Sequence, residues 1–157
     1  MWFFTNGGAF MLDGSFTVKV DEKGRVKIPS EFRRQIQERF GDGGFHVTSV
    51  RGDCALIYPT RAWEEVLQKL SAQPPSRVAV RKYRRATSFY GQPATIDPQG
   101  RVLIHPRLRA DAGIEDDVVI LGQQSHLEVW NLKRFKETLQ SDPLNAEDED
   151  FLASLGV

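Results

Sequence analysis

A fourteen-residue motif that occurs twice constrains the fold of this chain more than any other feature of its sequence. Residues 21–34 read DEKGRVKIPSEFRR, and residues 97–110, which begin 76 positions later, read DPQGRVLIHPRLRA. Six of the fourteen positions are identical. A shorter match follows each motif, ALIY at 55–58 and LEVW at 127–130. Such a duplication indicates one structural unit that is used twice.

Each copy predicts a strand, a turn, a second strand, a short helix, a hairpin and a final helix. Apolar and polar residues alternate over 16–20, as in a half-buried strand. Phe32, Ile36 and Phe40 recur every four residues before Gly41, which predicts a short amphipathic helix. Two such units can intertwine and cover strand edges that one unit leaves exposed. We therefore expect an α+β fold, mainly β with short helices, in which the two units form a pseudo-two-fold barrel.

The net charge of zero hides an uneven distribution of charge along the chain. Residues 1–141 hold all 21 Lys and Arg and 16 Asp and Glu, whereas residues 142–157 hold five acids and no base. A basic body favours a polyanionic partner. The acidic tail also carries Phe151, Leu152 and Leu155. Two interpretations of the tail stay open, because it is either disordered or docked through these apolar residues on a neighbouring subunit.

A basic segment lies between the two copies. Residues 77–85 contain five bases and no acid, and on a helix their arginines form one stripe, with Arg81, Arg84 and Arg85 as candidates for DNA contact. Tyr83 and Tyr90 fall on the opposite side, where they could pack inward. The stripe is either a phosphate-facing surface or an ordinary solvated helix face.

The turn inside each motif supplies the best candidates for function. Asp can bond nearby backbone amides and Gly tolerates positive φ, so we interpret Asp21, Gly24, Asp97 and Gly100 as turn-forming residues. The arginine after each glycine could reach a phosphate or a guanine edge. The alternative is an ion pair with the aspartate of its turn. These two arginines are Arg25 and Arg101.

Further basic residues surround the motifs, and the family resemblance described below makes them candidates for DNA contact. Lys19, Lys23 and Lys27 flank Arg25, with Lys23 at the tip of the turn. Arg33, Arg34 and Arg109 lie early on the short helices. A solvated helix face is the alternative for these three, and above all for Arg34 and Arg109.

Several other classes of function find no support in the sequence. The single Cys54 and the three histidines lack metal-ligand spacing, so we expect no metal site and no cofactor. Nucleophile elbows, phosphate-binding glycine loops and dinucleotide fingerprints are missing, and we expect no catalytic residues and no enzyme. No stretch of the sequence reaches the roughly 18 apolar residues of a membrane span. These observations favour a cytoplasmic protein without a membrane partner.

The two motifs, their order and their spacing resemble the MraZ family, a tandem version of the AbrB-like swapped-hairpin barrel. The resemblance covers about Met11 to Leu139. It implies a nucleoid-associated bacterial transcriptional regulator, usually a repressor, that binds repeated promoter elements of double-stranded DNA upstream of the division and cell-wall gene cluster. It also implies assembly into a ring-shaped homo-oligomer. Alternatives are an AbrB-like antitoxin module and an RNA-binding or protein-binding regulator.

This resemblance divides the chain into five parts. They are an N-terminal extension at 1–10, a first AbrB-like repeat at 11–75, a basic linker helix at 76–91, a second repeat at 92–140 and an acidic tail at 141–157. The second copy departs from the first, since Pro98 and Gln99 replace Glu22 and Lys23. Because its turn has lost these charges, we expect Arg101 to contribute less to DNA binding than Arg25.

Overall fold

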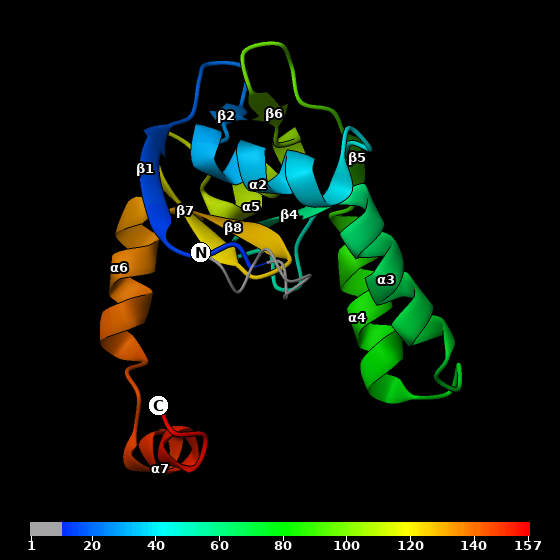
Figure 1. Cartoon of the computed structure of the whole chain (residues 1–157), viewed down its shortest axis with the longest axis vertical. Helices are drawn as coiled ribbons and strands as arrows, with labels where there is room; N and C mark the ends of the chain where they lie inside the picture. Colours follow the sequence, from blue (N-terminus) through cyan, green and yellow to red (C-terminus); the bar gives the residue numbers. More distant parts are fainter. Residues whose placement is uncertain (1–10) are drawn as a thin grey trace.

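The computed structural model describes residues 11–157 and contains eight strands and six helices within that range (Figure 1). The α+β class expected from the sequence is confirmed. The extension predicted at 1–10 lies outside the described residues.

Six strands form one sheet in which the two repeats exchange strands. Their order is β1 (Ser15–Lys19), β7 (Asp117–Gln123), β8 (His126–Asn131), β4 (Ala55–Pro59), β3 (Phe45–Thr48) and β5 (Gln92–Ala94). The hairpins β3–β4 and β7–β8 join side by side through β4 and β8. Strand β1 of the first repeat pairs with β7 of the second, and β5 of the second pairs with β3 of the first. Neither repeat therefore completes its own part of the sheet.

The remaining two strands form a ribbon that also joins the repeats. Strand β2 (Arg25–Lys27) pairs antiparallel with β6 (Arg101–Leu103), and Val26 lies opposite Val102. Both valines are fully buried, whereas Lys27 and Leu103 are exposed. One face of the ribbon therefore belongs to the core and the other faces solvent.

The larger of two hydrophobic clusters within residues 11–157 is built from equivalent positions of the two repeats. Ile28 and Phe32 of the first repeat and Ile104 and Leu108 of the second have no exposed surface and belong to the same cluster. Full burial of a side chain of this size stabilises a fold by about 1.5–3 kcal/mol. Both repeats therefore supply this main cluster, and a second, smaller cluster of the first repeat lies around Tyr58 and Trp63.

The sheet does not close into the barrel that the sequence analysis expected. Strands β1 and β5 stand at its two ends, and each pairs with a single neighbour within it. Strand β5 is only three residues long and contains Pro93, whose nitrogen has no proton to donate to another strand. A strand of this composition ends a sheet more readily than it closes one.

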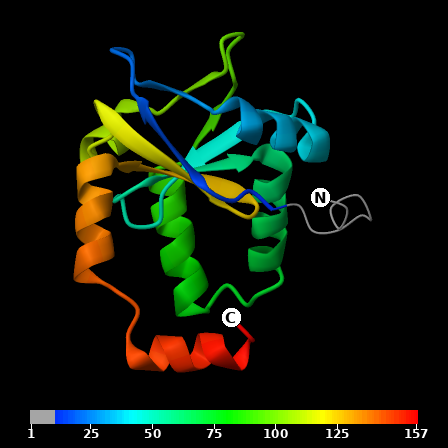
Figure 2. The same ribbon diagram turned by 60° about the vertical axis from the view of Figure 1, so that its left-hand side comes forward.

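The helices lie outside the sheet, as two groups and one separate C-terminal helix. Helix α2 (Ser30–Phe40) and the shorter α5 (Pro106–Ala112) follow the two ribbon strands. Helices α3 (Thr60–Ser71), α4 (Val78–Phe89) and α6 (Leu132–Ser141) extend away from the end that carries the turns before β2 and β6 (Figure 1). Helix α7 (Ala146–Ser154) lies at the far end of the molecule in both views (Figure 2). Over residues 11–157, we find no helix with the length and apolar character of a membrane span.

Candidate nucleic-acid interface

The two motif turns, residues 21–25 and 97–101, have the same backbone design and are called the paired turns below. Oδ1 of Asp21 accepts the backbone N–H of Lys23 at 3.0 Å and that of Arg25 at 2.9 Å. Oδ1 of Asp97 likewise accepts the N–H groups of residues 99 and 101, both at 2.9 Å. The glycines Gly24 and Gly100 have φ of 85° and 82°, a region in which other residues are strained. Each turn is thus built from its own local sequence.

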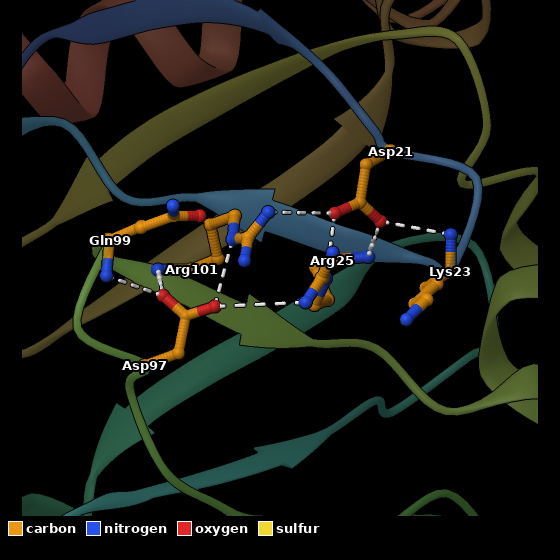
Figure 3. Close-up of polar contacts among 6 residues, drawn as sticks. All are labelled: Asp21, Lys23, Arg25, Asp97, Gln99 and Arg101. Carbon is orange, nitrogen blue, oxygen red and sulfur yellow. Dashed lines mark hydrogen bonds and ion pairs between the residues drawn. The ribbon is translucent and has the colours of Figure 1, made fainter.

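Four charged side chains link the paired turns across the ribbon (Figure 3). Nε of Arg25 donates to Oδ2 of Asp21 at 2.7 Å, and Nε of Arg101 donates to Oδ2 of Asp97 at 2.8 Å. Each guanidinium also approaches the other turn, with Nη1 of Arg101 3.5 Å from Asp21 Oδ2 and Nη1 of Arg25 3.9 Å from Asp97 Oδ2. Their side chains remain 26–29% exposed. The ion pairs therefore lie at the surface, where they can meet a ligand.

The electrostatics of this cluster orient the arginines. The backbone N–H of Arg25 and then its guanidinium hold the pKa of the Asp21 carboxyl below its ordinary value of 3.8, although desolvation opposes them. Arg101 has the same effect on the pKa of Asp97. Within the described part of the chain, neither Nη2 group has a hydrogen-bond partner. A guanidinium held through Nε and Nη1 is preorganised to donate from its free Nη2 group to a phosphate or a guanine. The ion pair and the DNA contact are therefore compatible.

Because β2 pairs with β6, one basic residue of the first repeat lies beside the turn of the second repeat. Lys27 lies directly opposite Arg101, whereas Arg25 lies opposite the apolar Leu103. Residues opposite each other in an antiparallel pair share a face, and like charges there repel. A hollow of about 570 Å³ beside the second turn is lined by Lys27, Arg33, Pro98, Gln99 and Arg101. This grouping could not be predicted from the sequence, because the residues of one strand do not show which strand pairs with it.

Arg33 and Arg109 each reach from the helix of one repeat to the turn of the other. Nε of Arg33 donates to the carbonyl of Ile28 at 3.0 Å, and Nε of Arg109 donates to that of Ile104 at 2.7 Å. A methyl group built on Gly100 would lie 2.8 Å from Cζ of Arg33, and one on Gly24 would lie 2.6 Å from Cδ of Arg109. Each turn thus has three basic side chains around it: Lys23, Arg25 and Arg109 at the first, and Lys27, Arg33 and Arg101 at the second.

Two other candidate residues have acidic partners. Nζ of Lys19 lies 3.1 Å from a carboxylate oxygen of Asp117 on the neighbouring strand. Arg34 pairs with Glu31 at 2.7 Å and with Glu38 at 2.9 Å on its own helix. All five side chains are more than half exposed, so these pairs contribute little to stability. Their carboxylates do reduce the local positive charge.

The basic stripe on α4 lies far from the paired turns. Helix α4 extends away from the end of the molecule that carries the turns (Figure 1). Arg81, Arg84 and Arg85 line a groove between α3 and α4 instead. Nη2 of Arg84 donates to Ser71 Oγ at 3.4 Å across that groove. The structure thus separates the predicted basic residues into two surfaces.

Comparison with known proteins gives the family. The family described as "MraZ protein, putative antitoxin-like" matches residues 11–86 and 92–153. The chain belongs to the MraZ family. A protein named transcriptional regulator MraZ from Acidobacterium capsulatum is 44% identical over 147 residues, which are 94% of this chain and the full length of that relative. Relatives with the same name from Koribacter versatilis and Pediococcus pentosaceus are 37% and 33% identical, over 94% and 88% of this chain and 100% and 93% of theirs.

Membership in the MraZ family agrees with the resemblance on which the sequence analysis relied. The two matched segments each contain one of the paired turns and one hairpin of the sheet. Since curated members carry the name of transcriptional regulators, the chain belongs to a family of such regulators.

Proposed function

We propose that this chain is a sequence-specific DNA-binding regulator that contacts double-stranded DNA through the solvent face of the β2–β6 ribbon and the paired turns. The observation that carries the proposal is the pair of arginines held by Asp21 and Asp97, each with a free Nη2 group at the surface. The names of the MraZ relatives support a regulatory role. A two-stranded ribbon is also narrow enough to enter the major groove of B-DNA.

The proposed contact divides into two kinds of interaction. Arg25 and Arg101 read base edges or adjacent phosphates through their free Nη2 groups, because their orientation is fixed by the carboxylates. Lys23, Lys27, Arg33 and Arg109 surround them and neutralise phosphates, a contribution that is the same for every sequence. Binding that depends on such neutralisation weakens steeply as the salt concentration rises.

We propose further that the chain acts as a repressor and assembles into a ring-shaped homo-oligomer. Each subunit offers one small contact set, so repeated promoter elements bound by several subunits gain affinity from avidity. The resemblance to the MraZ family supports the division and cell-wall gene cluster as the target, with the protein in the cytoplasm at the nucleoid. It supports no catalytic role. The duplication within one chain favours a regulator over a single-copy antitoxin module.

A footprint on the DNA upstream of the protein's own gene tests this proposal. We expect protection of short repeated elements and a fall in affinity between 50 and 200 mM salt of roughly 10³-fold if six phosphates are neutralised. Duplex RNA of the same sequence serves as the competitor, because its deep and narrow major groove does not admit the ribbon. Equal binding to unrelated DNA, or preference for RNA, would contradict the proposal. A promoter reporter then gives the sign of regulation.

A further inference from the structure

The acidic tail forms a helix for which the structure shows no covering surface. Oδ1 of Asn145 accepts the N–H of Asp148 at 2.8 Å, and Oδ2 of Asp148 accepts the N–H of Asn145 at 3.0 Å. This reciprocal capping box starts α7, and the acidic residues in its first turn stabilise the helix because they lie at the positive end of its dipole. A helix of nine residues is nevertheless marginal in water without packing. Its stability therefore calls for a partner surface.

The apolar side chains of this segment face solvent. Leu144, Phe151 and Leu155 are 63%, 64% and 61% exposed. Within the described part of the chain, every hydrogen bond of residues 143–157 stays inside that segment. Phe151, Leu152 and Leu155 share one side of α7, and Glu147 lies one turn before Phe151 on that side. The helix thus carries acids around its first turn and an apolar patch in its second half.

The groove between α3 and α4 has the complementary character. Its volume is about 680 Å³, and it is lined by Leu70, Ser71, Gln73, Pro75, Val80, Arg81, Arg84, Arg85 and Ser88. Arg81 and Arg84 make long hydrogen bonds, both 3.4 Å, to the carbonyl of Ser76 and to Ser71 Oγ. Over the range that the structure describes, none of the three arginines has an acidic partner. The arginines and the apolar side chains of the groove complement a helix whose first turn is acidic and whose second half is apolar.

We propose that α7 of one chain docks in the α3–α4 groove of a second copy of this chain. Helix α6, which leads to α7, stands on the flank of the molecule opposite α3 and α4 (Figure 1). The donor segment and the receiving groove are therefore two different surfaces on opposite flanks. A contact of this kind is head-to-tail, and repeated around a closing rotation it generates a ring. The inference rests on the self-association proposed above and assigns its interface.

Charge reversal in the full-length protein tests the docking. We expect R81E/R84E in the groove to weaken self-association at least roughly tenfold, and E147K on the apolar side of α7 to weaken it as well, because each leaves like charges facing each other. Combining these changes restores opposite charges, so association should return to within about threefold of the wild type. Sedimentation velocity over a range of concentrations measures each constant. Asp148 is left unchanged because it caps α7.

The matched control is K133E/K136E, which reverses two exposed charges on α6 outside both surfaces. It should leave association unchanged. Reversals without effect, an equal loss in the control, or the absence of rescue in the combined variant would each overturn the docking. Circular dichroism verifies that the groove variant folds. If the groove variant does not fold, the α7 variant alone still tests the docking, because α7 contributes no residue to the buried core.

A cysteine pair distinguishes docking between chains from docking within one chain. Val80 lines the groove and Phe151 lies on α7, so V80C/F151C should form covalent multimers under mild oxidation. A bond within single chains would overturn the inference. A wild-type chain that is monomeric at micromolar concentration would contradict both the proposed assembly and the docking. A wild type that assembles, with variants that assemble equally well, would contradict the docking alone. The footprint would still test DNA binding in either case.

Discussion

The two paired turns share a backbone but differ in side chains, and the difference shows how the ribbon redistributes charge. The first turn has Glu22 and Lys23 where the second has Pro98 and Gln99. The sequence therefore predicts that the second turn is the weaker DNA contact. In the structure, Lys27 of the first repeat lies opposite Arg101 in the second turn.

Helix residues complete this exchange between the turns. Arg33 and Arg109 each approach the glycine of the other repeat's turn. Each turn therefore has three basic side chains around it. A positive charge that is missing from the turn of one repeat is supplied by a residue of the other repeat. We expect the two turns to contribute to DNA binding more equally than their local sequences indicate.

The largest expected effect is the loss of either central arginine. Arg25→Ala and Arg101→Ala should each lower specific binding by about 1–3 kcal/mol per element, and the losses multiply when several subunits bind together. Fluorescence anisotropy with operator and scrambled DNA measures the discrimination. Arg25→Lys and Arg101→Lys serve as matched controls that retain the charge but remove the planar guanidinium edge.

The ratio of the two effects decides the comparison between the turns. Comparable losses of binding would support the exchange of basic side chains across the ribbon. A clearly smaller loss for Arg101→Ala would mean that the local sequence of each turn decides its contribution. Thermal unfolding of each variant must stay close to the wild type. Binding lost only together with folding or assembly would mean that the arginines brace the turns and do not read DNA.

A second effect concerns the space around the turn glycines. Gly24→Ala and Gly100→Ala should each lower the free energy of unfolding by about 1–3 kcal/mol, because φ is positive and the added methyl collides with Arg109 or Arg33. Gly14→Ala is the matched control, since its φ of 89° is similar but no atom lies within 4 Å of the added methyl. Urea unfolding measures all three. Equal losses at Gly14 and Gly24 would show that the crossing arginine adds nothing.

A third, smaller effect concerns the partner of Lys27. Lys27→Gln and Lys23→Gln should each weaken binding to all DNA alike and reduce the salt slope by about one. In double-mutant cycles, Lys27 should couple to Arg101, its neighbour across the ribbon, because coupling follows spatial proximity. Coupling of Lys27 to Arg25 instead would contradict the exchange across the ribbon.

The smallest effect is the acid dependence of the two aspartates. Their folded-state pKa values lie below the ordinary 3.8, so they stabilise the fold above that pH and lose the contribution as pH falls through the folded values. Melting temperatures between pH 2 and 6 should therefore fall less steeply for Asp21→Asn and Asp97→Asn than for the wild type. The two variants should behave alike, since the causes match, and an unchanged pH profile would argue against both ion pairs.

Local chemistry could be predicted wherever neighbours in the chain decide the structure. The Asp and Gly spacing predicts the turns, the four-residue spacing of Phe32, Ile36 and Phe40 predicts α2, and the repeat itself predicts two equivalent units. The capping box at Asn145 and Asp148 was also present in the sequence as a signal for α7, although the sequence analysis left this tail open. These features depend on interactions between residues two to four positions apart in the chain.

Only the tertiary structure decided which residues meet across the repeats. The exchange of β1 and β5, the open sheet, the pairing of Lys27 with Arg101 and the separation of the α4 stripe from the turns could not be read from one sequence. Strand register depends on side chains far apart in the chain that bury a common face, here through Val26 and Val102. The sequence therefore determined two turns with an arginine each, and packing between the repeats determined which bases surround them.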